Sequence, residues 1–406
     1  MSAAAACVPM LAPPAALSSS SSSSHHHHHH RPAEAELNKA SGTRVVQDEA
    51  TVEAESVERA GVDDDVISSR PRAVVQTLTC ERKQIADGFA LWRSIGRPEL
   101  PDLDPFLSFD EFEFSPPAGF PDHPHRGFES VTYMLEGGLS YHDFSGHKGT
   151  INKGDVQWMT AGRGVVHAEM PGGEGVQRGI SIWVNLSAKD KITSHQKKKT
   201  FPFSQRAINT VACLLLIRCA VPCNTSRVEP KYQEMASDVI PVAEKDDGVS
   251  VKVIAGDCLG TSSPLRPRTP AMCLDVTLQP GAALRQPVPR GWSACAYVLA
   301  GEAVFAGSTA AAAAARTLVV FGGDGDCVEV RGGAGEGARV LLVAARPHGE
   351  AVARDGPFVM NTAEEVEQAR EDYRRRRNGF EMADGWTSDH ATALTSNSRN
   401  QKIRNE

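Results

Sequence analysis

Two short segments, His123-Pro124-His125 and His167-Ala168-Glu169, decide how this chain is interpreted. In a β-strand, residues i and i+2 lie on the same face, so each segment can direct two side chains toward one point. The two pairs are evenly spaced, since 167 − 123 = 44 and 169 − 125 = 44, and two neighbouring strands could enclose a site between them. Imidazoles with one carboxylate favour iron, manganese, nickel or copper over calcium or magnesium. The sequence therefore predicts a metal site formed by His123, His125, His167 and Glu169.

Each of these histidines, taken singly, could be an ordinary core or surface residue. Their clustering favours a metal site, because six of the 14 histidines form the run His25–His30 and five of the other eight lie between His123 and His167. His142 and His147 fall outside the alternating pattern. We interpret these two as structural residues of loops or strand ends.

The amino-terminal region differs in composition from the rest of the chain. Residues 1–73 contain Ser and His runs and an acidic segment, with too little apolar surface to offset the entropy of ordering, which predicts disorder. The run His25–His30 is either an added tag or a natural tract, and it could bind metal by itself. The first 33 residues contain no acid, as in plastid transit peptides, but they lack the arginines usual there before Arg31.

Composition excludes several classes of protein. The net charge of −7 argues against direct nucleic-acid binding, which depends on clustered Lys and Arg. The apolar run Val211–Ile217 ends at Arg218, well short of a membrane span. Nine cysteines without a C-x-x-C pair suit a reducing compartment. We expect a monomer in the nucleus or cytoplasm, with the plastid as the alternative, that binds neither nucleic acid nor membranes.

From about Val74 onward, short apolar runs alternate with Gly, Pro and Asp turns, which predicts an all-β fold. Strands are expected at Val131–Leu135, Val156–Thr160, Ile180–Leu186, Val249–Ile254, Ala271–Leu278, Ala294–Leu299, Thr317–Phe321 and Val340–Ala344. The segment YVLAGE at 297–302 echoes YMLEGG at 133–138, which indicates an internal duplication. No histidine occurs between His195 and His348, so the second barrel is expected to hold no metal.

The carboxyl-terminal region has one helical pattern. Thr362 and Glu365 form a capping box for a helix over 363–377, and Asn378-Gly379 should end it. The arginines at 374–377 follow several acids and are interpreted as a solvated helix end. The predicted divisions are a disordered extension (1–73), a metal-binding barrel (74–187), an insertion (188–227), a barrel without metal (228–350), a segment with a helix packed on the barrels (351–386) and a loose tail (387–406).

The stretch from Pro121 to Pro171 resembles the signature of the pirin family within the cupin superfamily. Three segments carry the resemblance: FPDHPHRGFE at 120–129, GDVQWMTAGRG at 154–164 and HAEMP at 167–171. Further similarity lies at 93–97, 103–107, 291–292 and 356–362, so the resemblance covers about 75–187 and 228–386. Pirins are bicupins, two β-barrels face to face with iron only in the amino-terminal barrel. The resemblance implies a plant-type pirin-like protein that binds Fe(II), or else Mn, Ni or Cu, through His123, His125, His167 and Glu169.

The family resemblance leaves two functions open. Some pirins cleave the flavonol quercetin with dioxygen, which implies a quercetin 2,3-dioxygenase with a flavonol-like substrate and Glu169 as both ligand and catalytic base. Animal pirins are nuclear iron proteins that assist transcription factors, and plant-like members are linked to G-protein signalling. The alternative is therefore a non-enzymatic, iron-dependent coregulator or binding module for a transcription factor or G-protein partner. A wide apolar cavity beside the metal would favour the enzyme.

Two further features need interpretation. Family members reach the equivalent of Val228 within a few residues of Leu186, whereas about 36 extra residues (228 − 192 = 36) intervene here. We interpret them as a translated intron or another gene-model error, with a real surface loop as the alternative. Arg126 and Arg163 either support the metal site from behind its ligands or form surface salt bridges.

Overall fold

The computed structural model describes residues 70–191, 228–306 and 312–391, and this part of the chain is built mainly of antiparallel β-strands. The eight strands expected from the sequence are all present, with ends that differ from the prediction by a few residues. The run His25–His30 and positions 192–227 of the predicted insertion lie outside the described residues. No helix in the described part is long and apolar enough to cross a lipid bilayer.

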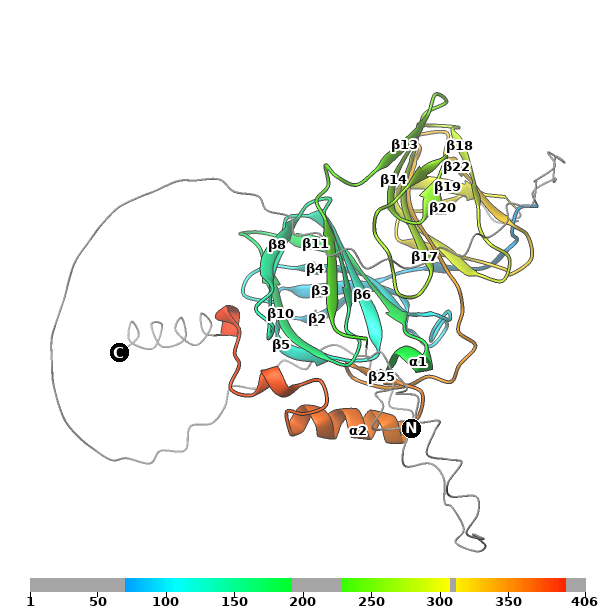
Figure 1. Ribbon diagram of the computed structural model, residues 1–406. Helices are drawn as coiled ribbons and strands as arrows, with labels where there is room; N and C mark the ends of the chain where they lie inside the picture. Colours follow the sequence, from blue (N-terminus) through cyan, green and yellow to red (C-terminus); the bar gives the residue numbers. More distant parts are fainter. Residues whose placement is uncertain (1–69, 192–227, 307–311, 392–406) are drawn as a thin grey trace, which may run out of the picture. The chain divides into compact units, whose positions relative to one another are not determined.

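The first barrel combines a seven-stranded and a four-stranded sheet (Figure 1). The larger sheet has the order β12-β9-β6-β11-β4-β3-β2, and the smaller has the order β5-β10-β7-β8. Bounds in the larger sheet are β2 Arg82–Ala86, β3 Phe89–Ile95, β4 Phe106–Phe114, β6 Phe128–Glu136, β9 Val156–Thr160, β11 Gln177–Asn185 and β12 Lys231–Met235. Those in the smaller sheet are β5 Phe120–His125, β7 Gly138–Asp143, β8 Lys148–Asn152 and β10 Val165–Pro171.

The second barrel is one ten-stranded sheet, whose main path runs β1-β21-β19-β23-β17-β14-β13. Its strands are β1 Val74–Thr79, β13 Val242–Lys245, β14 Val249–Ala255, β17 Ala271–Leu278, β18 Ala283–Pro287, β19 Ser293–Phe305, β20 Ala313–Ala314, β21 Thr317–Phe321, β22 Cys327–Gly332 and β23 Ala338–Ala345. Smaller elements are the hairpins β15 Asp257–Cys258 with β16 Thr261–Ser262 and β24 Ala353–Asp355 with β25 Phe358–Met360, and the helices α1 Ala188–Lys191, α2 Ala363–Arg374 and η3 Glu381–Ala383.

The two barrels exchange their first strands. β1 pairs with β21 of the second barrel, and β12 pairs with β9 of the first. The sheets therefore do not follow the predicted divisions 74–187 and 228–350 at their first strands, because an apolar pattern identifies a strand but not its partner. The predicted disordered extension is also too long by a few residues, since buried Arg72 donates hydrogen bonds to the main-chain oxygens of Trp292 (2.6 Å) and Pro289 (2.7 Å).

The large sheets of the two barrels pack against each other through a shared apolar core. Two buried tyrosines cross this interface in opposite directions. The Tyr133 hydroxyl of β6 donates to Asp275 Oδ2 in β17 (2.6 Å), and the Tyr297 hydroxyl of β19 donates to Glu111 Oε2 in β4 (2.9 Å). The structure thus confirms an all-β fold of two facing barrels, and the echo between the segments at 133 and 297 marks equivalent positions in them.

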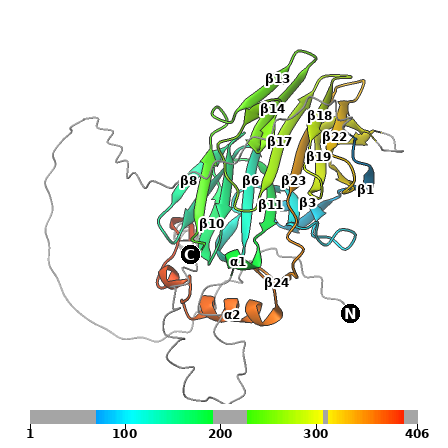
Figure 2. The ribbon, with the colours of Figure 1, turned by 45° about the vertical axis from the view of Figure 1, so that its right-hand side comes forward.

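Helix α2 lies alongside β24 and β25 (Figures 1 and 2). Its capping box is confirmed, since Thr362 Oγ1 accepts from the Glu365 N–H and the Glu365 carboxylate accepts from the Thr362 N–H. The helix ends at Arg374, earlier than the predicted 377, because Arg376 already has a positive φ of 51°. The tail is not loose from 387, because Ser388 is buried and its N–H donates to Asp122 Oδ2 (3.2 Å).

Candidate metal centre

The four predicted metal ligands lie on two paired strands of the small sheet. His123 and His125 are on β5, and His167 and Glu169 are on β10. The strands are antiparallel, and their register places His167 directly opposite His123. An i, i+2 spacing on each strand therefore brings imidazoles from both strands to the same face, which is the arrangement that the sequence spacing predicts.

Three imidazole nitrogens converge in the interior of the first barrel. His123 Nε2 lies 2.9 Å from His125 Nε2 and 3.1 Å from His167 Nε2. Imidazole nitrogens that bind one ion at about 2.1 Å, at right angles to each other, are separated by about 3.0 Å, so the observed spacing fits a shared first-row metal ion. These three side chains form a group able to hold a metal ion.

The protonation of the imidazoles also suits metal binding. His123 Nδ1 lies 2.8 Å from the Pro121 main-chain oxygen, and a hydrogen bond donated there leaves the Nε2 lone pair free. Burial lowers the pKa of His123 to about 4 and keeps the pKa values of His125 and His167 well below the ordinary value, with neighbouring imidazoles adding to the effect. The three rings are therefore neutral near pH 7, the state that a metal ligand requires.

Glu169 lies beside the imidazoles, somewhat apart from them. Its Oε2 is 3.8 Å from His167 Nε2, and the β5–β10 register shifts between His167 and Glu169, so that Glu169 pairs with Phe120. Such a shift, typical of a β-bulge, changes the aim of a side chain. Burial raises the pKa of Glu169 to about 7. The structure thus brings three of the predicted ligands together, and the role of Glu169 as fourth ligand stays a prediction.

Aromatic side chains form one wall of the site. The His125 ring contacts Phe128 edge-on at 5.1 Å and Trp183 at 5.4 Å, and these two rings stack on each other at 4.2 Å between centroids. Trp183 was not singled out from the sequence. Nor was Tyr232 on β12, whose pKa is raised by burial and by the nearby charges of Asp143 and Glu169. Tyr232 follows the insertion and appeared to belong to the second barrel.

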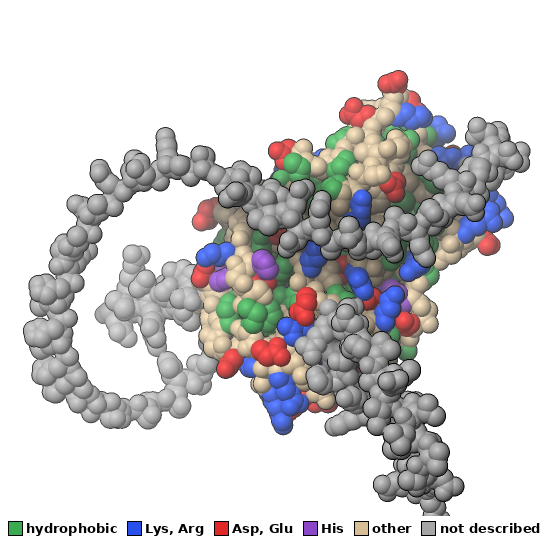
Figure 3. Space-filling model, in the orientation of Figure 1, with side chains coloured by type: hydrophobic (Ala, Val, Ile, Leu, Met, Phe, Trp, Pro, Cys, Tyr) green, Lys and Arg blue, Asp and Glu red, His purple; other side chains and the backbone are tan. Residues whose placement is uncertain are grey.

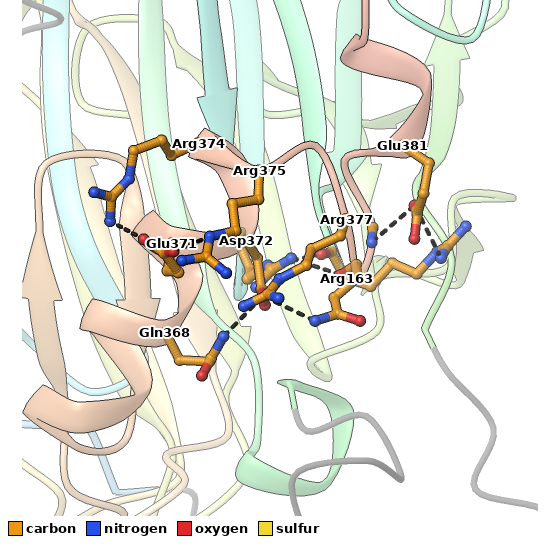
Figure 4. A network of polar contacts seen from close by, with 11 residues as sticks. Arg163, Gln368, Glu371, Asp372, Arg374, Arg375, Arg377 and Glu381 are labelled. Carbon is orange, nitrogen blue, oxygen red and sulfur yellow. Dashed lines mark hydrogen bonds and ion pairs between the residues drawn. The ribbon is translucent and has the colours of Figure 1, made fainter.

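Arg126, the residue after His125 at the end of β5, ties this strand to the carboxyl-terminal helix. Its buried guanidinium lies 3.0 Å from Asp372 Oδ2 and donates to the main-chain oxygens of Arg163 and Asn378, both at 2.7 Å. Asp372 also accepts from Gln368, Asn378 and Arg377 (Figure 4). Of the two interpretations of Arg126, the surface salt bridge is therefore wrong, and support from behind the ligands fits its position.

The other polar residues considered in the sequence analysis, Arg163, His142 and His147, lie outside the cluster of three histidines. Arg163 forms an ion pair at 2.6 Å with the exposed Glu229, as expected for a surface salt bridge. His147 is exposed and lies 3.2 Å from Asp143 Oδ2. His142 Nδ1 accepts from the Asp389 N–H at 3.1 Å, and its ring packs against Trp386. Neither histidine belongs to the group of three converging rings, in agreement with the structural role predicted for them.

The comparison with protein families matches both barrels. The family described as pirin matches residues 88–184, and the pirin C-terminal cupin domain matches residues 273–379. A pirin-like protein of Solanum lycopersicum is 46% identical over 322 residues, covering 79% of this chain and 98% of the relative. The chain belongs to the pirin family. Human pirin is 42% identical over 323 residues, which cover 79% of this chain and 99% of the human protein.

Two solved structures share the fold of this chain. A crystal structure described as quercetin 2,3-dioxygenase from Acinetobacter baumannii has a TM-score of 0.62 and 27% identity, covering 77% of this chain and 99% of its own. A structure of the protein GK1651 from Geobacillus kaustophilus has a TM-score of 0.57 and 28% identity, covering 70% of this chain and 100% of its own. The pirin fold of this chain therefore extends over both barrels.

Proposed function

We propose that this pirin is a metal-dependent dioxygenase that cleaves flavonols such as quercetin. The observation that supports the proposal is the buried convergence of three imidazole nitrogens in a fold shared with a protein described as quercetin 2,3-dioxygenase. His123, His125 and His167 would hold the ion, with iron as the first choice and Glu169 as the fourth ligand. When bound, the metal would supply Lewis-acid and redox chemistry.

The residues around the histidines fit such a reaction. Glu169 is partly buried, with 14% of its side chain exposed, and lies beside the His167 ring, where its carboxylate could accept the proton of the flavonol 3-hydroxyl group. Phe128 and Trp183 provide an apolar wall against His125 that would exclude water from the reacting carbons. In the overall reaction, two carbon–carbon bonds of the heterocycle break, both atoms of dioxygen are retained in the depside product, and the carbon between the broken bonds leaves as carbon monoxide.

The test is turnover of quercetin by the full chain in which the run His25–His30 is replaced by serines, because that run would bind metal by itself. The iron-loaded protein, incubated with quercetin in air, should release carbon monoxide and the depside. His125→Ala should lose most of its iron and its turnover, whereas the exposed control His147→Ala should keep both. Glu169→Gln should lower kcat by about 10²- to 10⁴-fold, the usual contribution of a general base.

Absence of turnover in the iron-loaded protein would overturn the enzymatic proposal. The alternative function, a binding module for a transcription factor or G-protein partner, would then predict partner binding that depends on the iron oxidation state. Unchanged iron content in His125→Ala would instead remove this residue from the ligand set and contradict both functions, because both need the same site.

A further inference from the structure

A polar cavity of about 630 Å³ lies between the barrels, away from the histidine cluster. One wall consists of residues of the first barrel and α1, including Thr160, Lys189 and Lys231. The opposite wall consists of the segment 266–270, which precedes β17, and of Arg346 and His348, which follow β23. A concave space of this size suits a small molecule.

The charges that line this cavity are predominantly positive. The lining contains two carboxylates, Asp190 and Glu229. It contains five cationic side chains: Lys189, Lys231, Arg266, Arg268 and Arg346. Both carboxylates are already engaged, Asp190 with Arg268 at 2.5 Å and Glu229 with Arg163 at 2.6 Å, and Arg163 is not part of the lining. Around α1, the space-filling view shows Lys and Arg side chains beside acidic ones (Figure 3). The excess of cations is notable in a chain whose net charge is −7.

Four of the five cations, all except Arg268, form no ion pair with residues of 70–191, 228–306 and 312–391. Lys231 on β12 and Arg346 after β23 are both exposed, and neither side chain forms an ion pair or hydrogen bond within these ranges. They come from different walls of the cavity and from different barrels. A ligand that reaches both must therefore carry negative charge at more than one point.

The wall of the cavity is held in place before any ligand binds. Buried Glu129 accepts hydrogen bonds from the main-chain N–H groups of Arg268 (3.0 Å) and Thr269 (2.9 Å), which fixes the segment that carries Arg266 and Arg268. His348 Nε2 lies 2.9 Å from the Asn185 main-chain oxygen and fixes the end of the other segment. A wall fixed in this way loses little conformational entropy on binding.

We propose that this cavity binds a small polyanion, a molecule that carries two or more phosphate or carboxylate groups. Phosphate and carboxylate are the groups that Arg and Lys recognise through charge-assisted hydrogen bonds. A long nucleic acid is disfavoured as the ligand, because the net charge of −7 repels a large polyanion. This site is independent of the metal centre and of the proposed dioxygenase reaction.

The test is calorimetric titration of the metal-free full chain with pyrophosphate and, separately, with tricarballylate, which distinguishes phosphate from carboxylate recognition. Lys231→Gln combined with Arg346→Gln should weaken binding of the preferred anion at least about tenfold, since two charged contacts are lost. Lys245→Gln combined with Arg331→Gln is the matched control, because it changes the net charge equally at exposed positions outside the cavity. The control variant should bind the anion as tightly as the unmodified protein does. Added potassium chloride should weaken anion binding by the control variant and by the unmodified protein alike.

Three results would overturn the proposal. The first is no binding of either anion at millimolar concentration. The second is equal weakening in the two double variants, which would indicate attraction by overall charge only. The third is binding of inorganic phosphate as tight as that of pyrophosphate, which would contradict recognition at more than one point. All four substituted side chains are exposed, so both variants should fold, which thermal unfolding of the metal-free proteins checks directly.

Discussion

Asp372 pairs with two arginines whose exposure differs greatly, and this difference allows a quantitative prediction. Arg126 Nη1 lies 3.0 Å from Asp372 Oδ2, and the exposed fractions of the two side chains are 4% and 1%. Arg377 Nε lies 3.2 Å from the other carboxylate oxygen, but its side chain is 43% exposed. Asp372→Ala leaves the Arg126 charge buried without its carboxylate, which should cost about 3–5 kcal/mol in the free energy of unfolding. Arg377→Ala removes an exposed partner and should cost less than about 1 kcal/mol.

Hydrogen exchange of the main-chain amides in α2 measures how much the Arg126–Asp372 pair stabilises this helix. The last turn of α2 is attached to β5 through this carboxylate, so Asp372→Ala should lower the free energy of opening of α2 far more than Arg377→Ala does. Because Arg126 follows His125 directly, the same variant should also weaken iron binding, by about 10- to 100-fold as for other residues that support a ligand from behind. Equal protection of α2 in the two variants would refute the reasoning, because burial would then not decide the strength of the pair.

Three further predictions concern the interface between the barrels, the connection between β5 and β6, and the binding of Fe(II). Tyr133→Phe and Tyr297→Phe should each lower the free energy of unfolding by about 1.5–3 kcal/mol, the value of a hydrogen bond to a charged group, measured by denaturant titration. Gly127→Ala would place a Cβ 1.9 Å from a main-chain oxygen of β25 and should destabilise the protein much more than Gly146→Ala, which has a similar φ of 88° and open space around it; similar losses would contradict the clash. Saturating the metal-free protein with Fe(II) at 100 times its Kd should add about 2.7 kcal/mol of stability, and His125→Ala should show no such gain.

The convergence of His123, His125 and His167 was predictable from the sequence because its geometry is local. An i, i+2 spacing on a strand fixes which side chains share a face, and the repeated separation of 44 residues indicated two strands that pair. The capping box at Thr362 is local in the same sense, since both hydrogen bonds form within four residues. Features of this kind depend on neighbouring residues only, and the structure has them where the sequence places them.

The features that sequence reasoning missed depend on distant residues. The partner of Arg126 lies 246 positions later in the chain, and nothing near Arg126 indicates it. The register shift beside Glu169 arises in the pairing of β10 with β5, whereas the H-x-E spacing implies an unbroken strand. The exchange of β1 and β12 is likewise a matter of partner choice, because each has an ordinary strand pattern that either barrel could accept.

The symmetry of the interface indicates why the second barrel persists without the histidines of the first. In each large sheet, one central residue pairs with both the tyrosine and the acid that cross the interface: Ile180 with Tyr133 and Glu111, and Leu341 with Tyr297 and Asp275. Each barrel thus supplies the acid that the other's tyrosine needs, and each also supplies the other's edge strand. Neither large sheet is complete alone, so substitutions there are constrained in both halves.

The strands that contribute no side chain to the shared core are free of this constraint. In the first barrel they include β5 and β10, which carry the three converging histidines, whereas the strands β18 and β22 of the second half contain no histidine. Ligands could therefore be lost or kept on these strands without disturbing the interface. We infer that the second barrel is retained because it completes the sheet that positions β6 and β11 of the first, and that removing it would expose the core shared by the two sheets even though the three converging histidines would remain.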